Sequence, residues 1–379
     1  MSNKSRGGHS NGRMNRRSLL QSAAALVSVP LIAKATTAWA QEKLNGEGEV
    51  VAYSWGGSYT DGLRKYVYEP FTEATGIKVV DVIADVAEPQ ITAMHQAGRI
   101  DWDIAYITRR FYPEMHEAGM FVPIDYSLWD QESVDGTPAH LRIEDAVGVI
   151  QFAYLLGYDK RAFPGGGPQN WVDFWDVEKF PRARGLYGLV GRHNIVAALI
   201  ADGVAPKDVW PLTNDKLDRA FKKLDEIKPH VDKWWTAGGE PVQLLMNQEY
   251  AMTLAADGRL ATAIKSGAPL EIVWEGGYVS HVYQSILKGG PNTVNAQKLI
   301  AFMNRAQISA GFTQGTGYPG PNTNALKYMP AEVAGLSSAN PKNASKLISE
   351  DSNWLAAKRP DGKSNIDHVE ERWKEWKTK

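Results

Sequence analysis

The sequence predicts an α/β protein folded as two lobes with a ligand cleft between them. Short apolar runs typical of strands alternate with amphipathic segments typical of helices, which is the pattern of this fold class. The 339 residues that follow position 40 are too many for one small core and suit two lobes of ordinary domain size. The chain contains no cysteine, which excludes a disulfide framework, a thiol nucleophile and thiolate metal sites.

The first forty residues have the pattern of an export signal. They hold six lysines and arginines and no acid, and the apolar stretch 19–33 is too short to span a bilayer. Ala38-Trp39-Ala40 supplies an A-x-A cleavage pattern, so we expect cleavage after Ala40 and a mature chain that begins at Gln41. Residues 15–20 resemble a twin-arginine signal, and an ordinary secretory signal is the alternative. Both routes lead to the periplasm.

The charge and hydropathy of the mature chain exclude several classes of partner. It carries 36 lysines and arginines against 43 acids, a net charge of −7 that argues against nucleic acid and anionic membrane surfaces. No later stretch offers the roughly 18 apolar residues of a membrane helix, so no membrane insertion of the mature chain is expected. The 13 tryptophans and 15 tyrosines exceed what packing requires and suit a pocket for a small ligand, although most will be core residues.

The predicted first lobe begins with a strand–helix–strand unit. The helix is opened by Thr60 and Asp61, places Leu63, Val67, Phe71 and Ala74 on one face, and ends near Gly76. The last predicted strand is a short apolar run of the kind that lies inside a parallel sheet. The segments in order are a strand at 50–54, a glycine-containing turn at 55–59, the helix, a strand at 77–83, a helix at 88–97 and a strand at 102–107.

The middle of the chain repeats this alternation and is predicted to form the second lobe. It includes a charged amphipathic helix at 215–227; a helix around 299–303, a Gly/Pro-rich stretch at 315–322 and a helical tail at 369–376 follow. The Gly/Pro-rich stretch fits a crossing between lobes. The predicted parts are 41–151 and 281–321 for lobe 1, and 152–280 and 322–379 for lobe 2.

A series of motifs in a fixed order then points to a family. The motifs are Tyr53-Ser54-Trp55-Gly56-Gly57, Pro70 to Val79 (PFTEATGIKV), Trp102-Asp103-Ile104, Ala118 to Asp125 (AGMFVPID), Gly157-Tyr158-Asp159-Lys160, Asn170 to Asp176 (NWVDFWD) and Gly317 to Asn322 (GYPGPN). No single motif is specific, but their collinear order resembles the family 1 extracellular solute-binding proteins, in particular the spermidine/putrescine-binding branch.

The resemblance implies the type II periplasmic-binding-protein architecture, in which two α/β lobes joined by a hinge close around a small solute. It also implies the periplasmic component of an ABC importer, which delivers its solute to membrane permease subunits, acts as a monomer and catalyses nothing. Solute binding would stabilise the closed form through contacts with both lobes.

The resemblance places aromatic residues at the ligand. Trp55, Gly56 and Tyr59 fall on the first-lobe loop that touches ligand in the family, and their alternative role is ordinary loop packing. Trp235 is predicted to lie at the cleft, because its segment resembles one found in some members of this branch. The alternative is that Trp234 and Trp235 pack into the second lobe.

The acids that hold ammonium groups in polyamine binders are missing. Val190 and His193 stand where two of them are expected, and Ser280 and Val282 stand in place of a Trp and an Asp. Tyr278 lies in this second segment and is included in the predicted site. Three ammonium partners are therefore absent.

Arginines occur in the same regions instead. Thr108-Arg109-Arg110 replaces a Ser/Thr-x-Tyr pattern, and Asp257-Gly258-Arg259 replaces Asn-Gly-Ser. We predict Arg110, Arg192 and Arg259 as clamps for an anion and Asp257 as the acid for an amine, with Thr108 and His193 beside them. A surface salt bridge is the alternative for each arginine. The predicted solute is an amino acid, ω-amino acid or aminophosphonate, and the alternative is a polyamine.

Catalytic and metal-binding patterns are weak. The glycines at 315, 317 and 320 match a dinucleotide pattern by letter only, because Pro319 intervenes and no amphipathic helix follows. No G-x-S-x-G or H-E-x-x-H occurs, and no two tyrosines are adjacent as in an Fe(III) binder. We therefore expect no enzyme activity, no cofactor and no metal. An Fe(III)-binding protein or a periplasmic enzyme are the remaining alternatives.

Overall fold

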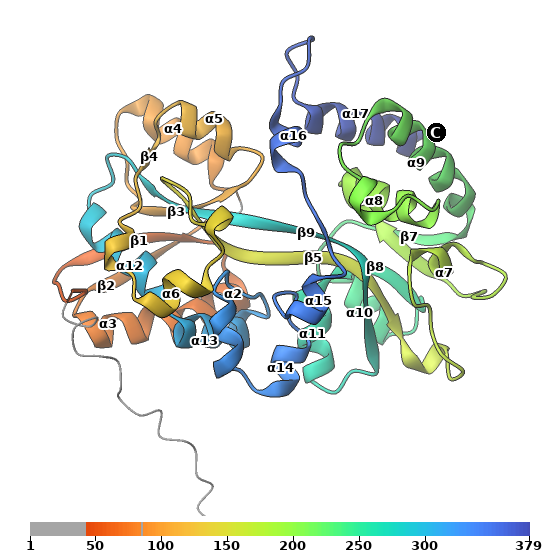
Figure 1. Ribbon diagram of the computed structural model, residues 1–379, viewed down its shortest axis with the longest axis horizontal. Helices are drawn as coiled ribbons and strands as arrows, with labels where there is room; N and C mark the ends of the chain where they lie inside the picture. Colours follow the sequence, from red (N-terminus) through yellow and green to blue (C-terminus); the bar gives the residue numbers. More distant parts are fainter. Residues whose placement is uncertain (1–42, 85) are drawn as a thin grey trace, which may run out of the picture. The chain divides into compact units, whose positions relative to one another are not determined.

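A computed structural model describes residues 43–84 and 86–379, and the predicted export signal and its cleavage site lie outside these residues. The described strands form one mixed sheet in the order β2-β1-β3-β9-β5-β8-β6-β7, with β4 and β10 also paired to β9 (Figure 1). The strands are β1 (Glu49–Ser54), β2 (Lys78–Ile83), β3 (Ile104–Thr108), β4 (Phe121–Val122), β5 (Val147–Asp159), β6 (Arg184–Tyr187), β7 (Val231–Trp235), β8 (Met252–Ala256), β9 (Leu270–Leu287) and β10 (Ile348–Ser349).

The helices cover this sheet. The longer ones are α4 (Glu88–Ala97), α8 (Gly191–Ala201), α9 (Asn214–Ile227), α11 (Asp257–Lys265), α12 (Thr293–Met303), α13 (Ala306–Thr316) and α17 (Asn365–Thr378). The shorter α-helices are α2 (Gly57–Leu63), α3 (Glu69–Thr75), α5 (Tyr112–Glu117), α6 (Gln131–Gly136), α7 (Trp171–Trp175), α10 (Glu240–Met246), α14 (Ala331–Gly335), α15 (Pro341–Ala344) and α16 (Ser352–Ala356). Among the described residues, no helix is long and apolar enough to cross a membrane.

The first strand–helix–strand unit forms as predicted, with a different start to its helix. β1 and β2 are parallel, and Leu63, Val67 and Phe71 are fully buried between them and the rest of the first core. The helix begins at Gly57, and the Thr60 hydroxyl accepts the Gly56 N–H at 2.8 Å from within the first turn. A π-helical turn, η1 (Arg64–Tyr68), separates α2 from α3.

The prediction of a parallel sheet around residues 102–107 is only half correct. β3 is buried and pairs parallel with β1, but its other neighbour is β9, which runs antiparallel to it. A strand with partners on both sides needs apolar residues on both faces whatever the direction of those partners, so the apolar run could not show the direction.

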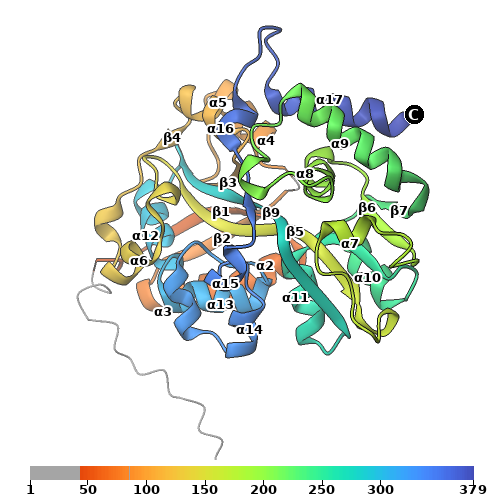
Figure 2. The same cartoon turned by 45° about the vertical axis from the view of Figure 1, so that its right-hand side comes forward.

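β5 and β9 connect two hydrophobic cores. They pair antiparallel from Val147–Gln284 to Asp159–Leu270, with irregularities between Gly148 and Ile150 and between Tyr154 and Leu156 (Figure 2). One end of this ribbon packs in the first core, with β1, β3, α4 and α12, and the other end packs in the second core, with α7, α8, α9 and α17. A smaller cluster around α10 and α11 adjoins the second end. The chain therefore passes between the cores inside continuous strands.

Other predicted helices agree with the structure, namely those at 88–97, 215–227, 299–303 and 369–376. The Gly/Pro-rich stretch follows α13, which ends at Gly317 in the left-handed conformation (φ 78°), and the Pro319 carbonyl accepts the Gln151 N–H at 3.0 Å. Residues 323–328 contact α6 through the Asn324 amide, which donates to the Glu132 carbonyl at 2.9 Å. The lobe boundaries themselves stay a prediction.

Candidate functional site

The loop after β1 carries the predicted aromatic residues of the first lobe. Gly56 has a φ of 78°, a conformation that favours glycine, and lets the chain turn sharply into α2. The Trp55 ring lies 4.9 Å from Tyr59 and 4.8 Å from Tyr106, centroid to centroid. Burial raises the pKa of Tyr59 well above its ordinary value, so its hydroxyl is neutral. The Trp55 and Tyr59 side chains are both half-buried, so part of each ring stays exposed on this loop.

Arg259 lines a pocket of about 310 Å³ together with Tyr59, Tyr318 and Gln243. It stands in the first turns of α11, and its guanidinium lies beside the backbone of Gly238. None of the ion pairs formed within residues 43–84 and 86–379 includes Arg259. The pocket lining contains no carboxylate: its other residues are Gly239, Val242, Gly258, Thr262, Ala263 and Thr316.

Asp257, the predicted amine partner, is 1% exposed and is held by the backbone. Its carboxylate accepts the Ala153 N–H at 3.0 Å, which fixes the start of α11 against β5. Burial raises its pKa to about 6. The structure thus places Asp257 behind the Arg259 pocket, where it connects two elements.

A stack of aromatic rings stands at the second-core end of the β5–β9 ribbon. Tyr187 lies 4.2 Å from Trp235 with nearly parallel rings, and Tyr154 lies 4.2 Å from His193. The His193 side chain is buried and neither ring nitrogen has a hydrogen-bond partner, so burial lowers its pKa well below the usual value. Trp235 is 1% exposed and donates to the Leu254 carbonyl at 3.1 Å. Trp235 therefore packs inside the second core, and Tyr154 and Tyr187 are the half-buried members of the stack.

Arg192 has carboxylate partners in the protein itself. Its guanidinium lies 3.2 Å from the Glu370 carboxylate on α17 and 3.5 Å from that of Glu350 after β10. It also donates to the Tyr278 hydroxyl at 3.2 Å, and Tyr278 is hydrogen-bonded to Glu350. Arg192 and Tyr278 thus join α8, β9 and the C-terminal segment in one buried network.

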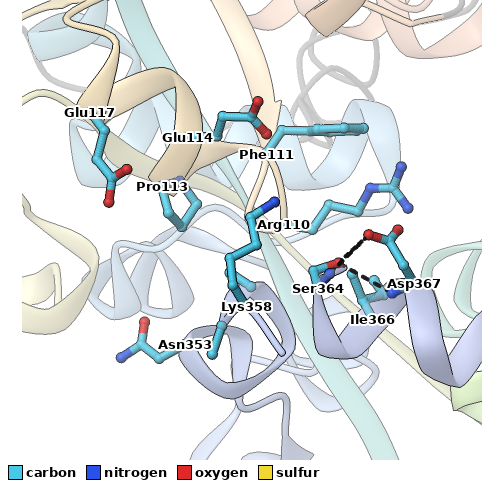
Figure 3. Close-up of a pocket in the computed structure, with 12 residues that line it drawn as sticks. Arg110, Phe111, Pro113, Glu114, Glu117, Asn353, Lys358, Ser364, Ile366 and Asp367 are labelled. Carbon is cyan, nitrogen blue, oxygen red and sulfur yellow. Dashed lines mark hydrogen bonds between the residues drawn. The ribbon is translucent and has the colours of Figure 1, made fainter. Parts of the chain in front are cut away.

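Thr108 and Arg110 stand at the end of β3. The Thr108 N–H and hydroxyl both donate to Glu88, at 2.9 and 2.8 Å. Arg110 stacks over Phe111 at 4.1 Å and lines a separate pocket of about 470 Å³ between α5 and the C-terminal residues 353–367. Figure 3 shows its guanidinium beside Asp367, whose pKa is lowered chiefly by the Ser364 hydroxyl and further by Arg110.

The structure brings some predicted residues together and separates others. Tyr59 and Arg259 share one pocket, and His193 and Trp235 belong to one aromatic stack, whereas Arg110 and Arg192 lie in other environments. Sequence reasoning passed over Tyr154, Tyr187 and Tyr318. Tyr318 lies in the motif Gly317 to Asn322. Tyr154 lies within β5, and a tyrosine in a strand carries no signal that distinguishes an exposed ring from a core residue.

Fold and site together define a binding protein: two cores share a ribbon of two strands, and aromatic and arginine-lined pockets lie beside it. Residues 67–344 match the family model described as bacterial extracellular solute-binding protein. The chain belongs to this family, and it is an ABC transporter substrate-binding protein, as predicted.

Individual relatives are similar to this chain over most of its length. A γ-aminobutyric acid-binding protein of Pseudomonas aeruginosa is 30% identical over 84% of this chain and 87% of its own length. A solved ABC transporter substrate-binding protein of Bradyrhizobium japonicum is 30% identical, with a TM-score of 0.76, over 87% of this chain and 99% of its own. A solved γ-aminobutyric acid receptor is 28% identical, with a TM-score of 0.75, over 87% of this chain and 97% of its own. The resemblance to spermidine/putrescine-binding proteins is confirmed by one from Salmonella typhimurium, which is 26% identical over 76% of this chain and 82% of its own length.

Proposed function

We propose that this protein captures a small zwitterion of the ω-amino acid type, such as γ-aminobutyric acid (GABA), in the periplasm. It delivers the solute to the membrane permease of an ABC importer, acts as a monomer and catalyses no reaction. Export by the signal in residues 1–40, with cleavage after Ala40, belongs to the same proposal. The names of two relatives support the choice of solute class.

Two pocket arginines without an ion-pair partner among the described residues, Arg109 and Arg259, carry the preference for a solute with an acidic group. Arg259 lines a pocket that contains no carboxylate, and it has no ion-pair partner within the described residues. A guanidinium in such a place attracts a carboxylate or phosphonate, because its planar fork matches two oxygens. The π faces of Tyr59 and Tyr318 in the same pocket suit the ammonium end of a zwitterion.

A polyamine is the second candidate, because the spermidine/putrescine-binding proteins are relatives. A polyamine has ammonium groups at both ends and needs several carboxylates. Val190 and the buried, neutral His193 stand where polyamine binders carry acids, and the Asp257 carboxylate already accepts the Ala153 N–H. This makes the zwitterion the better match to the described residues.

The proposal is tested by calorimetric titration and thermal unfolding of the mature protein with GABA, β-alanine, 5-aminovalerate, 2-aminoethylphosphonate, putrescine and spermidine. A solute present at 100 times its Kd should raise the unfolding free energy by about 2.7 kcal/mol. Stabilisation by a zwitterion and none by putrescine is expected. Stabilisation by putrescine alone would overturn the solute class, and turnover of a solute would overturn the claim that the protein is not an enzyme.

A further inference from the structure

Arg109 differs from the three arginines that the sequence singled out. Its Nε is buried and has no hydrogen-bond acceptor. Arg192 is paired with Glu350 and Glu370, while Arg110 and Arg259 are exposed, so that water can hydrate their charges. A buried guanidinium N–H without an acceptor is costly, because it has lost water and gained nothing in return. The Arg109 side chain as a whole is half-buried, and an oxygen acceptor beside its Nε would offset this cost.

The surroundings of Arg109 form a pocket of about 520 Å³. Its guanidinium carbon lies 5.5 Å from the centroid of the Tyr283 ring on β9, which limits the directions that the side chain can take. Ser352 and Asn353, at the start of α16, line the same pocket. Tyr283 belongs to the first core and α16 packs beside the second through Trp354, so both parts of the fold contribute walls.

The charged groups around this pocket are arranged in two zones. Glu117 and Glu144 line it from exposed positions, and neither forms an ion pair within the described residues. The Asp145 carboxylate is occupied by the Tyr112 hydroxyl and by His116 at 2.7 Å. One half-buried cation and two exposed, unpaired carboxylates in the same pocket match a molecule with an acid at one end and an amine at the other.

We infer that Arg109 is the residue that holds the acidic group of the solute, with the ammonium end directed towards Glu117 and Glu144. This inference rests on the proposed function and adds the place and orientation of the ligand. Because residues of both cores line the pocket, a solute bound to Arg109 contacts both, which is what stabilises a closed form.

The sequence of Thr108-Arg109-Arg110 explains how one turn supplies two different arginines. Thr108 is fixed to Glu88 by two hydrogen bonds, and the Phe111 N–H donates to the Thr108 carbonyl at 3.0 Å. This tight turn directs Arg109 and Arg110 into neighbouring pockets that share Pro113, Glu117 and Asn353. The Arg109 Nε is buried, whereas the Arg110 side chain is exposed.

The experiment compares Arg109→Gln, Arg109→Lys and Arg259→Gln, with Arg99→Gln as matched control. Arg99 is an exposed first-core arginine with an 82% exposed side chain and a partner of its own, Asp101. Each variant is titrated with GABA and, where the wild type prefers it, with 2-aminoethylphosphonate. We expect Arg109→Gln to weaken binding at least tenfold, Arg109→Lys and Arg259→Gln to weaken it less than Arg109→Gln does, and Arg99→Gln to change it less than threefold.

A second measurement keeps the inference testable if Arg109→Gln folds poorly. The wild type should prefer GABA to its uncharged amide, 4-aminobutyramide, and Arg109→Lys should reduce that preference at unchanged thermal stability. Wild-type affinity in Arg109→Gln, or tenfold loss in Arg259→Gln alone, overturns the assignment and leaves the proposed function intact. Failure of the wild-type protein to bind any zwitterion overturns the proposed function first.

Discussion

The two cores differ in how they use buried charge. In the first core, the buried carboxylate of Asp103 accepts the N–H groups of Val51 and Asn292, so an acid satisfies the backbone of its own core. In the second core, Arg184 is 1% exposed and donates to the carbonyls of Phe174 and Phe180, and Arg192 is paired with Glu350 and Glu370. Arg184 and Arg192 of the second core therefore have structural partners within the protein.

The C-terminal helix α17 is what makes the second core different. Trp373 is 1% exposed and stacks on Trp376 at 5.1 Å, and Glu370 on the same helix pairs with Arg192. Gly191 at the start of α8 faces Trp373 so closely that a Cβ there would lie 2.4 Å from its side chain. Packing and charge of the second core thus both depend on residues more than 170 positions away along the chain.

The largest effect is expected when this packing is removed. Trp373→Ala should lower the unfolding free energy by about 3 to 5 kcal/mol, the usual cost of truncating a buried tryptophan. Hydrogen exchange should accelerate in α8 and α9 and stay slow in β1 and β3. Phe302→Ala, which removes a buried ring of the first core, is the matched control and should show the reverse pattern. Equal loss of protection in both regions would show that the cores do not open separately.

A smaller effect is expected when the charge network is broken. Glu370→Gln should lower the unfolding free energy by about 1.5 to 3 kcal/mol, because it removes a charged partner from a guanidinium that is 18% exposed. Arg64→Gln is the control: Arg64 bridges to Asp81 in the first core, but its side chain is 46% exposed, so a clearly smaller loss is expected. Urea unfolding of both variants measures the difference. Equal losses of unfolding free energy would show that the difference in burial between the two ion pairs does not determine their contribution to stability.

The smallest effect concerns His281 on β9, the strand that both cores share. Burial, followed by the charges of Arg109 and His140, lowers its pKa to about 3. A histidine with a depressed folded pKa contributes its stability above its unfolded pKa of about 6.5, and this stability is lost as pH falls below that value. At pH 5.5 the loss should be about 1.4 kcal/mol relative to pH 8. His281→Gln, which can still donate to Gln151, should reduce this loss; an unchanged pH profile would contradict the assignment.

The sequence was sufficient to predict those elements whose pattern lies within a single segment of the chain. The face of Leu63, Val67 and Phe71 and the helices at 88–97 and 215–227 follow from periodicity within one element. The partners of a charged side chain are not local. Arg192 meets Glu370 through the packing of α17 on α8, and Asp257 meets Ala153 through the packing of α11 on β5, so an alignment of motifs could place both residues near a cleft but could not show that they are occupied.

The same limit applies to Arg109 and Arg110. Both are arginines in one motif, and their difference lies only in which side chain is shielded from water by Tyr283 and α16. Nothing in a single sequence distinguishes the two. The aromatic excess was informative in kind, because Tyr59 and Tyr318 line the Arg259 pocket, but Trp235 shows that a tryptophan can equally complete a core.

The irregular pairing of β5 between Tyr154 and Leu156 has a mechanical consequence. Such irregularities bend a strand and increase its twist, so the ribbon that joins the cores is bent beside the aromatic stack as well as near Gly148. If the ribbon flexes beside this stack, it acts as a lever: atoms near Tyr154 travel little, and atoms on the outer loops of the two cores travel furthest. Substitutions near the pivot should then change the affinity for solute, and substitutions on those outer loops should change how fast it enters and leaves.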